Sequence, residues 1–250
     1  MTDPLTAAII FAVFLLAGGV KGLVGFGLPT VSLGLLTVAF DLTTAMVLLL
    51  VPSFATNVWQ AAVGGNGRAI LSRIWPFLVT ATGTVWIGAL ALARVDLAWL
   101  SALLGLLLVI YAGLNLAGVR MTLTSRQETC WGPLIGIVNG VVTGMTGSFV
   151  VPGVLYLQAI GLSRDMLVQA MGIFFTLSTV ALALALRGNG VLDLSFGAWS
   201  GAALAPAALG MAAGQRIRKR LSEERFRQIL FVGLLMLGAY ITARSALTLA

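Results

Sequence analysis

The sequence predicts an all-α integral membrane protein, and three observations support this class. Hydrophobic residues make up 59% of the 250 residues and charged residues 9%, whereas a soluble domain carries about 25% charge. The charges separate apolar runs of about 20 residues or more, the length that a helix needs to cross a bilayer. The net charge of +7 comes mostly from residues standing singly between these runs. That distribution indicates a lipid bilayer, and not a nucleic acid, as the partner.

The composition also excludes several kinds of chemistry. A charged coat for a soluble core cannot be assembled, which excludes a cytosolic enzyme, a secreted domain and a disordered chain. The chain has no His and a single Cys, Cys130. A thiolate or imidazole metal site, an internal disulfide and a Cys/His catalytic pair are therefore excluded. No carboxylates are paired for acid–base work. We expect no enzymatic activity, no catalytic residue, no metal and no cofactor.

The N-terminal half, residues 1–119, begins with a run that is too long for one straight helix. Residues 5–40 would extend roughly 54 Å as a helix, far beyond a hydrocarbon core of roughly 30 Å. Glycines and Pro29 near the middle of this run predict an interruption. Asp41, an expected N-cap, then precedes three runs that each fit one transmembrane helix: residues 42–67, 74–93 and 97–119.

The C-terminal half, residues 130–250, follows the same plan after a polar linker at residues 120–129. Its first run, residues 131–162, carries no charge and would extend roughly 48 Å as a straight helix. Glycines and Pro152 lie near its middle, so this segment is also expected to be broken. Three further transmembrane helices are expected at residues 166–186, 194–215 and 225–248.

The two halves resemble each other in sequence, because Gly22 and Gly25 recur 122 residues later as Gly144 and Gly147. If each long run crosses once, the Lys and Arg residues outside Lys21 divide six against eight. If each run folds back or crosses twice, they divide three against eleven. The positive-inside rule favours the second division, which makes the halves inverted repeats, each a broken or hairpin segment plus three transmembrane helices. Whether the broken segments are re-entrant hairpins or pairs of spanning helices is left open.

This topology assigns sides to individual charges. Arg73 and Arg120 are expected to be cytoplasmic, and Arg94 and Arg187 to face the periplasm. Inverted repeats of this kind are typical of transporters whose substrate site lies near the bilayer midplane.

Lys21 is the most prominent candidate for function, since it is the one charge within residues 5–40. A lysine at that depth is a functional hypothesis by default, and the alternative is that it snorkels to an interface. The glycine-rich breaks are expected to line the pathway, because helix ends there suit anions, although small residues also serve helix packing. Gly105 and Gly233, inside ordinary helices, are expected to tolerate alanine.

The candidate substrate-binding residues therefore lie at the two breaks. They are Lys21, Gly22, Gly25 and Gly27 at the first, and Asn139, Thr143, Gly144, Thr146, Gly147 and Ser148 at the second. Amides on the following helices are further candidates for lining the pathway, with interhelical hydrogen bonding as the alternative: Asn57, Gln60 and Gln169.

The residues at the breaks carry a resemblance. Residues 18–29 read GGVKGLVGFGLP, residues 139–148 read NGVVTGMTGS, and Gln169-Ala170-Met171 follows. The chain resembles the TauE/SafE family of membrane proteins, commonly called sulfite exporters, over nearly its whole length. The resemblance implies a multi-pass protein of the bacterial inner membrane that moves sulfite, sulfonates or other small anions.

Together, the residues and the resemblance predict a secondary transporter. It would export a small anion, sulfite or an organosulfonate-type sulfur anion, by alternating access with a midplane site between the two breaks. The alternatives are an anion channel or a small-anion importer of the same architecture, and a membrane-embedded assembly factor. Ion coupling and oligomeric state are left open, with a homo-oligomer as one option.

Overall fold

The computed structural model describes residues 3–119, 121–191, 194–218 and 222–249, and these residues form helices and no strand. Arg120, whose side of the membrane the sequence predicts, lies outside the described residues. Within these described ranges, six helical segments are long and apolar enough to cross a membrane: Pro4–Val24, Leu42–Ala62, Gly67–Ala93, Leu97–Leu116, Arg164–Gly188 and Glu224–Leu249. The predicted class, an all-helical integral membrane protein, agrees with these segments.

The chain divides into two compact units, and each takes elements from both halves of the sequence. Unit 1 comprises residues 1–52, 97–118 and 193–250, and unit 2 comprises residues 53–96 and 119–192. The described helices of unit 1 are α1 (Pro4–Val24), α2 (Leu28–Ala39), the first part of α3 (Leu42–Ala62), α6 (Leu97–Leu116), α10 (Leu194–Ala202), α11 (Leu204–Ile217) and α12 (Glu223–Leu249). Those of unit 2 are the second part of α3, α4 (Gly67–Gly83), α5 (Val85–Ala89), the 3-10 helix η1 (Leu90–Ala93), α7 (Ser125–Thr146), α8 (Gly153–Ala159) and α9 (Arg164–Gly188).

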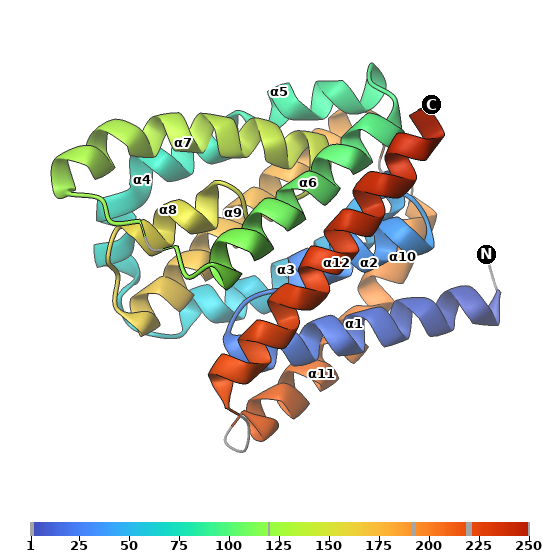
Figure 1. Cartoon of the computed structure of the whole chain (residues 1–250), viewed down its shortest axis with the longest axis horizontal. Coiled ribbons are helices and arrows are strands. Elements are labelled where there is room, and N and C mark those ends of the chain that lie inside the picture. The colour runs from blue at the N-terminus through green and yellow to red at the C-terminus, as the bar shows by residue number, and fades with distance from the viewer. Residues whose placement is uncertain (1–2, 120, 192–193, 219–221, 250) are drawn as a thin grey trace. The chain divides into compact units, whose positions relative to one another are not determined.

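Two long helix pairs organise unit 1: α1 lies along α11, and α6 lies along α12 (Figure 1). At the second pair, a Cβ added to Gly105 would lie 2.4 Å from Thr242 Oγ1 and 2.7 Å from the Gly238 carbonyl oxygen. The expectation that Gly105 tolerates alanine is therefore wrong, because its missing side chain lets α12 approach closely. Gly233 has no atom within 4 Å of such a Cβ, in agreement with its expected tolerance.

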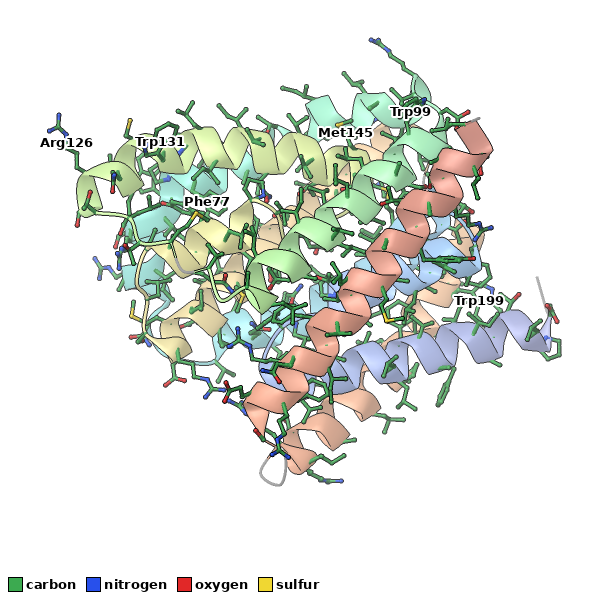
Figure 2. All side chains as sticks on the ribbon, viewed as in Figure 1. Phe77, Trp99, Arg126, Trp131, Met145 and Trp199 are labelled. Atoms are coloured by element: carbon green, nitrogen blue, oxygen red, sulfur yellow. The ribbon has the colours of Figure 1, made fainter. Side chains whose placement is uncertain are left out.

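Unit 2 is organised around α7, which runs along α4 and α5 (Figure 1). Its core contains aromatic rings. Phe77 of α4, labelled in Figure 2, has its ring centroid 4.8 Å from that of Tyr156 in α8 and 5.0 Å from that of Phe174 in α9. Trp131, near the start of α7, is exposed. An outward tryptophan near a helix end is typical of membrane proteins.

Several helix boundaries differ from those expected, because charges mark the ends of helices less reliably than turn residues do. The expected helix at residues 42–67 ends at Ala62, since Gly64 and Gly65 have φ of +124° and +73°. The expected linker at residues 120–129 is half helical. There, Thr124 and Gln127 form a capping box in which each side chain bonds the other's backbone N–H, and α7 starts at Ser125.

The other two differences are interruptions inside expected single helices. The segment at residues 74–93 belongs to a helical stretch that starts at Gly67 and is interrupted at Thr84. The segment at residues 194–215 is divided at Ala203. Pro206 follows three residues later and has no N–H to offer the preceding turn.

Candidate functional site

The first break is a short turn between α1 and α2 in which two glycines adopt a left-handed backbone. Gly25 has φ +87° and Gly27 has φ +105°, values that residues with a Cβ rarely adopt. The Gly25 N–H donates to the Lys21 carbonyl oxygen at 2.8 Å, which ends α1. The Val31 N–H donates to the Gly27 carbonyl oxygen at 2.8 Å, at the start of α2. The predicted interruption of residues 5–40 is confirmed, and these two glycines produce it.

Lys21 lies in the last turn of α1, immediately before this break. It continues a buried stripe that Ile10, Phe14 and Ala17 form at helical spacing, and 4% of its surface is exposed. An ammonium that snorkelled to the lipid–water interface would be exposed. The burial of Lys21 therefore favours a place inside the protein, which is the position that the functional hypothesis requires.

Gly22, the neighbour of Lys21, has a packing role in the structure. A Cβ on Gly22 would lie 2.2 Å from the Met211 carbonyl oxygen, and one on Gly18 would lie 2.2 Å from that of Ala207. From the other side, Gly210 and Gly214 of α11 approach the backbone of α1 equally closely. Pairs of glycines four residues apart on both helices thus let the backbones touch. Substrate contact by Gly22 remains a prediction.

The second break begins at Gly147 in the same way as the first begins at Gly25. Gly147 has φ +71°, and its N–H donates to the Thr143 carbonyl oxygen at 2.7 Å. This is the left-handed cap that Gly25 forms with Lys21. The chain then continues without helix to Pro152, where the short α8 begins. The predicted interruption of residues 131–162 is therefore also confirmed.

The structure brings the polar candidates of this second break together. Asn139 is fully buried, and its Oδ1 accepts from the Gly153 N–H at 2.8 Å, which holds the start of α8 against α7. Its Nδ2 donates to Thr143 Oγ1 at 3.3 Å, and Thr143 Oγ1 donates to the Ser148 carbonyl oxygen at 2.9 Å. This chain of hydrogen bonds spans the break from one helix to the next.

Two further hydrogen bonds complete the network. The Ser148 N–H donates to Thr146 Oγ1 at 3.2 Å, and Thr146 Oγ1 donates to the Val142 carbonyl oxygen at 2.8 Å. The side chains of Asn139, Thr143 and Thr146 are thus engaged with the backbone or with each other. Their first effect is to fix the shape of the break. A direct contact with substrate remains a prediction for these three residues and for Ser148.

Gly144 has a packing role against a neighbouring helix, as Gly22 does. A Cβ on Gly144 would lie 2.1 Å from the Val85 carbonyl oxygen, and one on Gly140 would lie 2.4 Å from that of Ala81. The glycines of α7 therefore let it lie directly on α4 and α5. At both breaks, the glycines inside the first helix pack, and the glycine at its end turns the chain.

The three amide candidates lie on α3 and α9 in unit 2. Gln60 Nε2 donates to the Val168 carbonyl oxygen at 2.6 Å, and Gln169 Nε2 donates to that of Ala61 at 2.9 Å, so each glutamine binds the backbone of the other helix. Gln169 Oε1 also accepts from the Asn66 N–H at 3.0 Å. Asn57 is fully buried and donates to Ser53 Oγ at 3.1 Å. For both glutamines the structure supports interhelical hydrogen bonding, and a role in lining the pathway stays a prediction.

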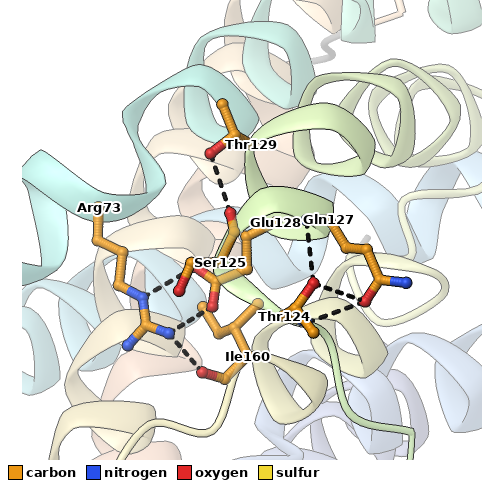
Figure 3. Close-up of polar contacts among 7 residues, drawn as sticks. All are labelled: Arg73, Thr124, Ser125, Gln127, Glu128, Thr129 and Ile160. Atoms are coloured by element: carbon orange, nitrogen blue, oxygen red, sulfur yellow. Dashed lines mark hydrogen bonds and ion pairs between the residues drawn. The ribbon is translucent and has the colours of Figure 1, made fainter.

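Sequence reasoning missed an ion pair that fixes the end of α8. Arg73 of α4 donates through Nε to Glu128 Oε2 of α7 at 2.9 Å, and its Nη2 contacts Glu128 Oε1 (Figure 3). The same Nη2 donates to the Ile160 carbonyl oxygen, at the C-terminus of α8, at 2.6 Å. Glu128 is buried. The signal that was available was the capping-box pattern beginning at Thr124, which places Glu128 on a helix instead of in a linker.

Among the described residues, no group of three or more His, Cys, Asp or Glu side chains is placed to hold a metal ion.

The model of a family described as sulfite exporter TauE/SafE matches residues 10–241 of the chain. No curated protein and no solved structure matches.

Proposed function

Since the chain belongs to the sulfite exporter TauE/SafE family, we propose that it exports a small sulfur anion, sulfite or an organosulfonate, by alternating access. The family match covers both breaks. Members of this family are membrane exporters of sulfur anions, so the general function is transport of a small anion across a membrane and not enzymatic conversion. The substrate within this class and the mechanism are our proposal.

The buried Lys21 carries the proposal. An anion that enters a low-dielectric site loses its hydration, and a buried cation offsets much of that loss. Lys21 lies at the end of α1, where Gly25 and Gly27 interrupt the helix. Non-helical backbone at membrane depth is tolerated where it is buried in protein or lines a watery cavity. An ammonium beside such backbone suits a small anion and disfavours a cation.

The direction of transport follows from the membrane potential. An interior-negative potential favours the exit of an anion by about 2.3 kcal/mol per charge per 100 mV. Export therefore needs no coupled ion. We place the protein in the bacterial inner membrane, where such a potential exists.

Binding of sulfite to the purified chain tests the role of Lys21. Lys21→Met keeps the length of the side chain and removes its charge, so the affinity should fall at least tenfold, or about 1.4 kcal/mol. Lys21→Arg keeps the charge in a wider group and should retain part of the affinity. Arg94→Gln, which removes an exposed charge, is the matched control and should bind like the wild type. Unchanged affinity in folded Lys21→Met protein would contradict the proposal.

Counterflow distinguishes a carrier from a channel. Proteoliposomes loaded with unlabelled sulfite should accumulate labelled sulfite from outside against its gradient if access alternates. A channel would let both pools equilibrate without transient accumulation. Labelled sulfite that never exceeds its external concentration would therefore refute alternating access and leave anion conduction.

A further inference from the structure

Unit 1 contains a cavity that the proposed transport function does not use. Its volume is about 170 Å³, and it lies where α2 ends, α3 and α6 begin, and α12 approaches its C-terminus. The polar groups that line it include Asp41, Ser101, Arg244 and Ser245. The first break lies at the opposite end of α2, roughly 18 Å away along the helix.

Arg244 supplies unused hydrogen-bond donors to this cavity. A guanidinium has five N–H donors. One donates from Nη1 to the Val38 carbonyl oxygen at 2.9 Å, near the C-terminus of α2. The side-chain donors that remain have no partner among the described residues. Capping α2 thus accounts for one of five donors and leaves a fork that fits a carboxylate or sulfonate.

Asp41 supplies a carboxylate that is nearly, but not fully, satisfied. Oδ1 accepts from Thr43 Oγ1 at 2.7 Å and from the Thr44 N–H at 2.9 Å, and Oδ2 accepts from Thr44 Oγ1 at 2.6 Å. A carboxylate offers about four acceptor positions, so Oδ2 retains one. Partial burial alone would raise the pKa of Asp41, but these hydrogen bonds outweigh it and lower the pKa below its ordinary value. The carboxylate is therefore ionised at neutral pH.

These two charges do not neutralise each other. Asp41 and Arg244 line the same cavity, and no hydrogen bond or ion pair joins them in the described part of the chain. The hydroxyls of Ser101 and Ser245 also line it, and neither has a hydrogen-bond partner within the described part of the chain. A plain anion would meet the carboxylate, and a plain cation would meet the guanidinium. A ligand with both charges satisfies both.

We propose that this cavity binds a small zwitterion, whose oxyanion lies on Arg244 and the two serine hydroxyls and whose ammonium lies on Asp41. One water needs about 10–15 Å³ of such volume, so a cavity of about 170 Å³ holds roughly 11 to 17 waters or one small organic ligand. A molecule of this size that carries one ammonium and one carboxylate or sulfonate is the class that fits the two charges. This site does not depend on the proposed export of a sulfur anion.

Three probes of similar size test the contribution of each charge to binding. β-Alanine carries both an ammonium and a carboxylate, propionate carries the carboxylate alone, and propylammonium carries the ammonium alone. Calorimetric titration of the purified full chain should show β-alanine binding at least tenfold more tightly than either singly charged probe. Arg244→Gln should weaken β-alanine binding at least tenfold. Arg94→Gln, an exposed arginine of unit 2, is the matched control and should leave it unchanged.

Asp41→Asn is the most specific variant, because asparagine caps helices as well as aspartate and should preserve the start of α3. It should weaken β-alanine binding at least tenfold while leaving propionate binding equal or stronger, an opposite response that general unfolding cannot produce. If the asparagine variant does not fold, Asp41→Ser provides the same test with another good N-cap. Absence of saturable β-alanine binding to the wild type would overturn the proposal. So would binding that either variant leaves unchanged, or a preference for propionate over β-alanine.

Discussion

Replacing Gly22 with alanine tests whether this signature glycine packs or binds substrate. The added Cβ would lie 2.2 Å from the Met211 carbonyl oxygen, whereas ordinary contacts begin at 3.4 Å, so α1 and α11 must shift by about an ångström. Overpacking of this kind destabilises by about 1–3 kcal/mol. In a helix interior, alanine itself is favoured over glycine by up to about 1 kcal/mol, which would mask part of the effect.

Gly19→Ala on the same helix removes that ambiguity. Its Cβ would lie 3.8 Å from the nearest atom, the Gly210 carbonyl oxygen, in ordinary contact. Both variants gain the same helix propensity, so the difference in unfolding free energy between them isolates the packing effect. We expect Gly22→Ala to be about 1–3 kcal/mol less stable than Gly19→Ala, measured by equilibrium unfolding in mixed detergent micelles.

The two explanations of Gly22 give opposite results. If Gly22 packs, stability falls and the folded fraction binds sulfite with wild-type affinity. If Gly22 binds substrate, affinity falls while the two variants unfold alike. Equal stability of Gly19→Ala and Gly22→Ala would refute the close approach of α1 and α11 described above.

Three further predictions concern the second break and the charged residues. Gly147→Ala should destabilise the protein by about 1–2 kcal/mol, because alanine disfavours φ +71°, and sulfite flux should fall, whereas Gly233→Ala should leave both unchanged. Glu128→Gln should lower the unfolding free energy by about 1–3 kcal/mol, since the Glu128 side chain is 9% exposed while that of Arg73 is 38% exposed. The double variant with Arg73→Gln should lose less than the two single losses combined. The pKa of Asp41 is lower in the folded than in the unfolded protein, so the stabilising effect of its ionised carboxylate is complete above about pH 4 and declines as the pH falls below that value. Asp41→Asn should flatten this part of the pH–stability curve. An unchanged curve would contradict the hydrogen bonds assigned to Asp41.

Much of the fold could be predicted from sequence, because the bilayer imposes simple lengths. Residues 5–40 and 131–162 are too long for one straight helix across a bilayer, so each had to be interrupted. Glycine and proline residues indicated the position of each interruption. The exact ends of helices were less predictable. Gly64 and Gly65 end α3 although the nearest charge is Arg68, and the capping box at Thr124 starts α7 inside a stretch that polarity alone assigned to a linker.

It could not be predicted from the sequence that each unit takes helices from both halves of the chain, because this depends on which helices pack together. The helix before the first break, α1, packs on α11 from the C-terminal half. The helix before the second break, α7, packs on α4 and α5 from the N-terminal half. Each broken segment is thus supported by helices from the other half. This reciprocity is what two repeats of one plan would produce, and the inverted orientation of the repeats remains a prediction.

The glycines of the two glycine-rich signatures fall into two groups with different structural roles. Gly18 and Gly22, like Gly140 and Gly144, are spaced four apart and lie against the backbone of a neighbouring helix. Gly25 and Gly147 instead end their helices with positive φ. Spacing therefore separates the glycines that pack against a neighbouring helix from those that turn the chain. Helix packing and chain turning account for both groups of glycines without any contact to a ligand. At the second break, the side chains of Asn139, Thr143 and Thr146 are engaged with the protein itself. At the first break, neither the packing nor the turning of the chain calls for a charge, yet Lys21 places one in a buried position. We therefore expect anion recognition to depend on the charge of Lys21 and not on the glycine pattern.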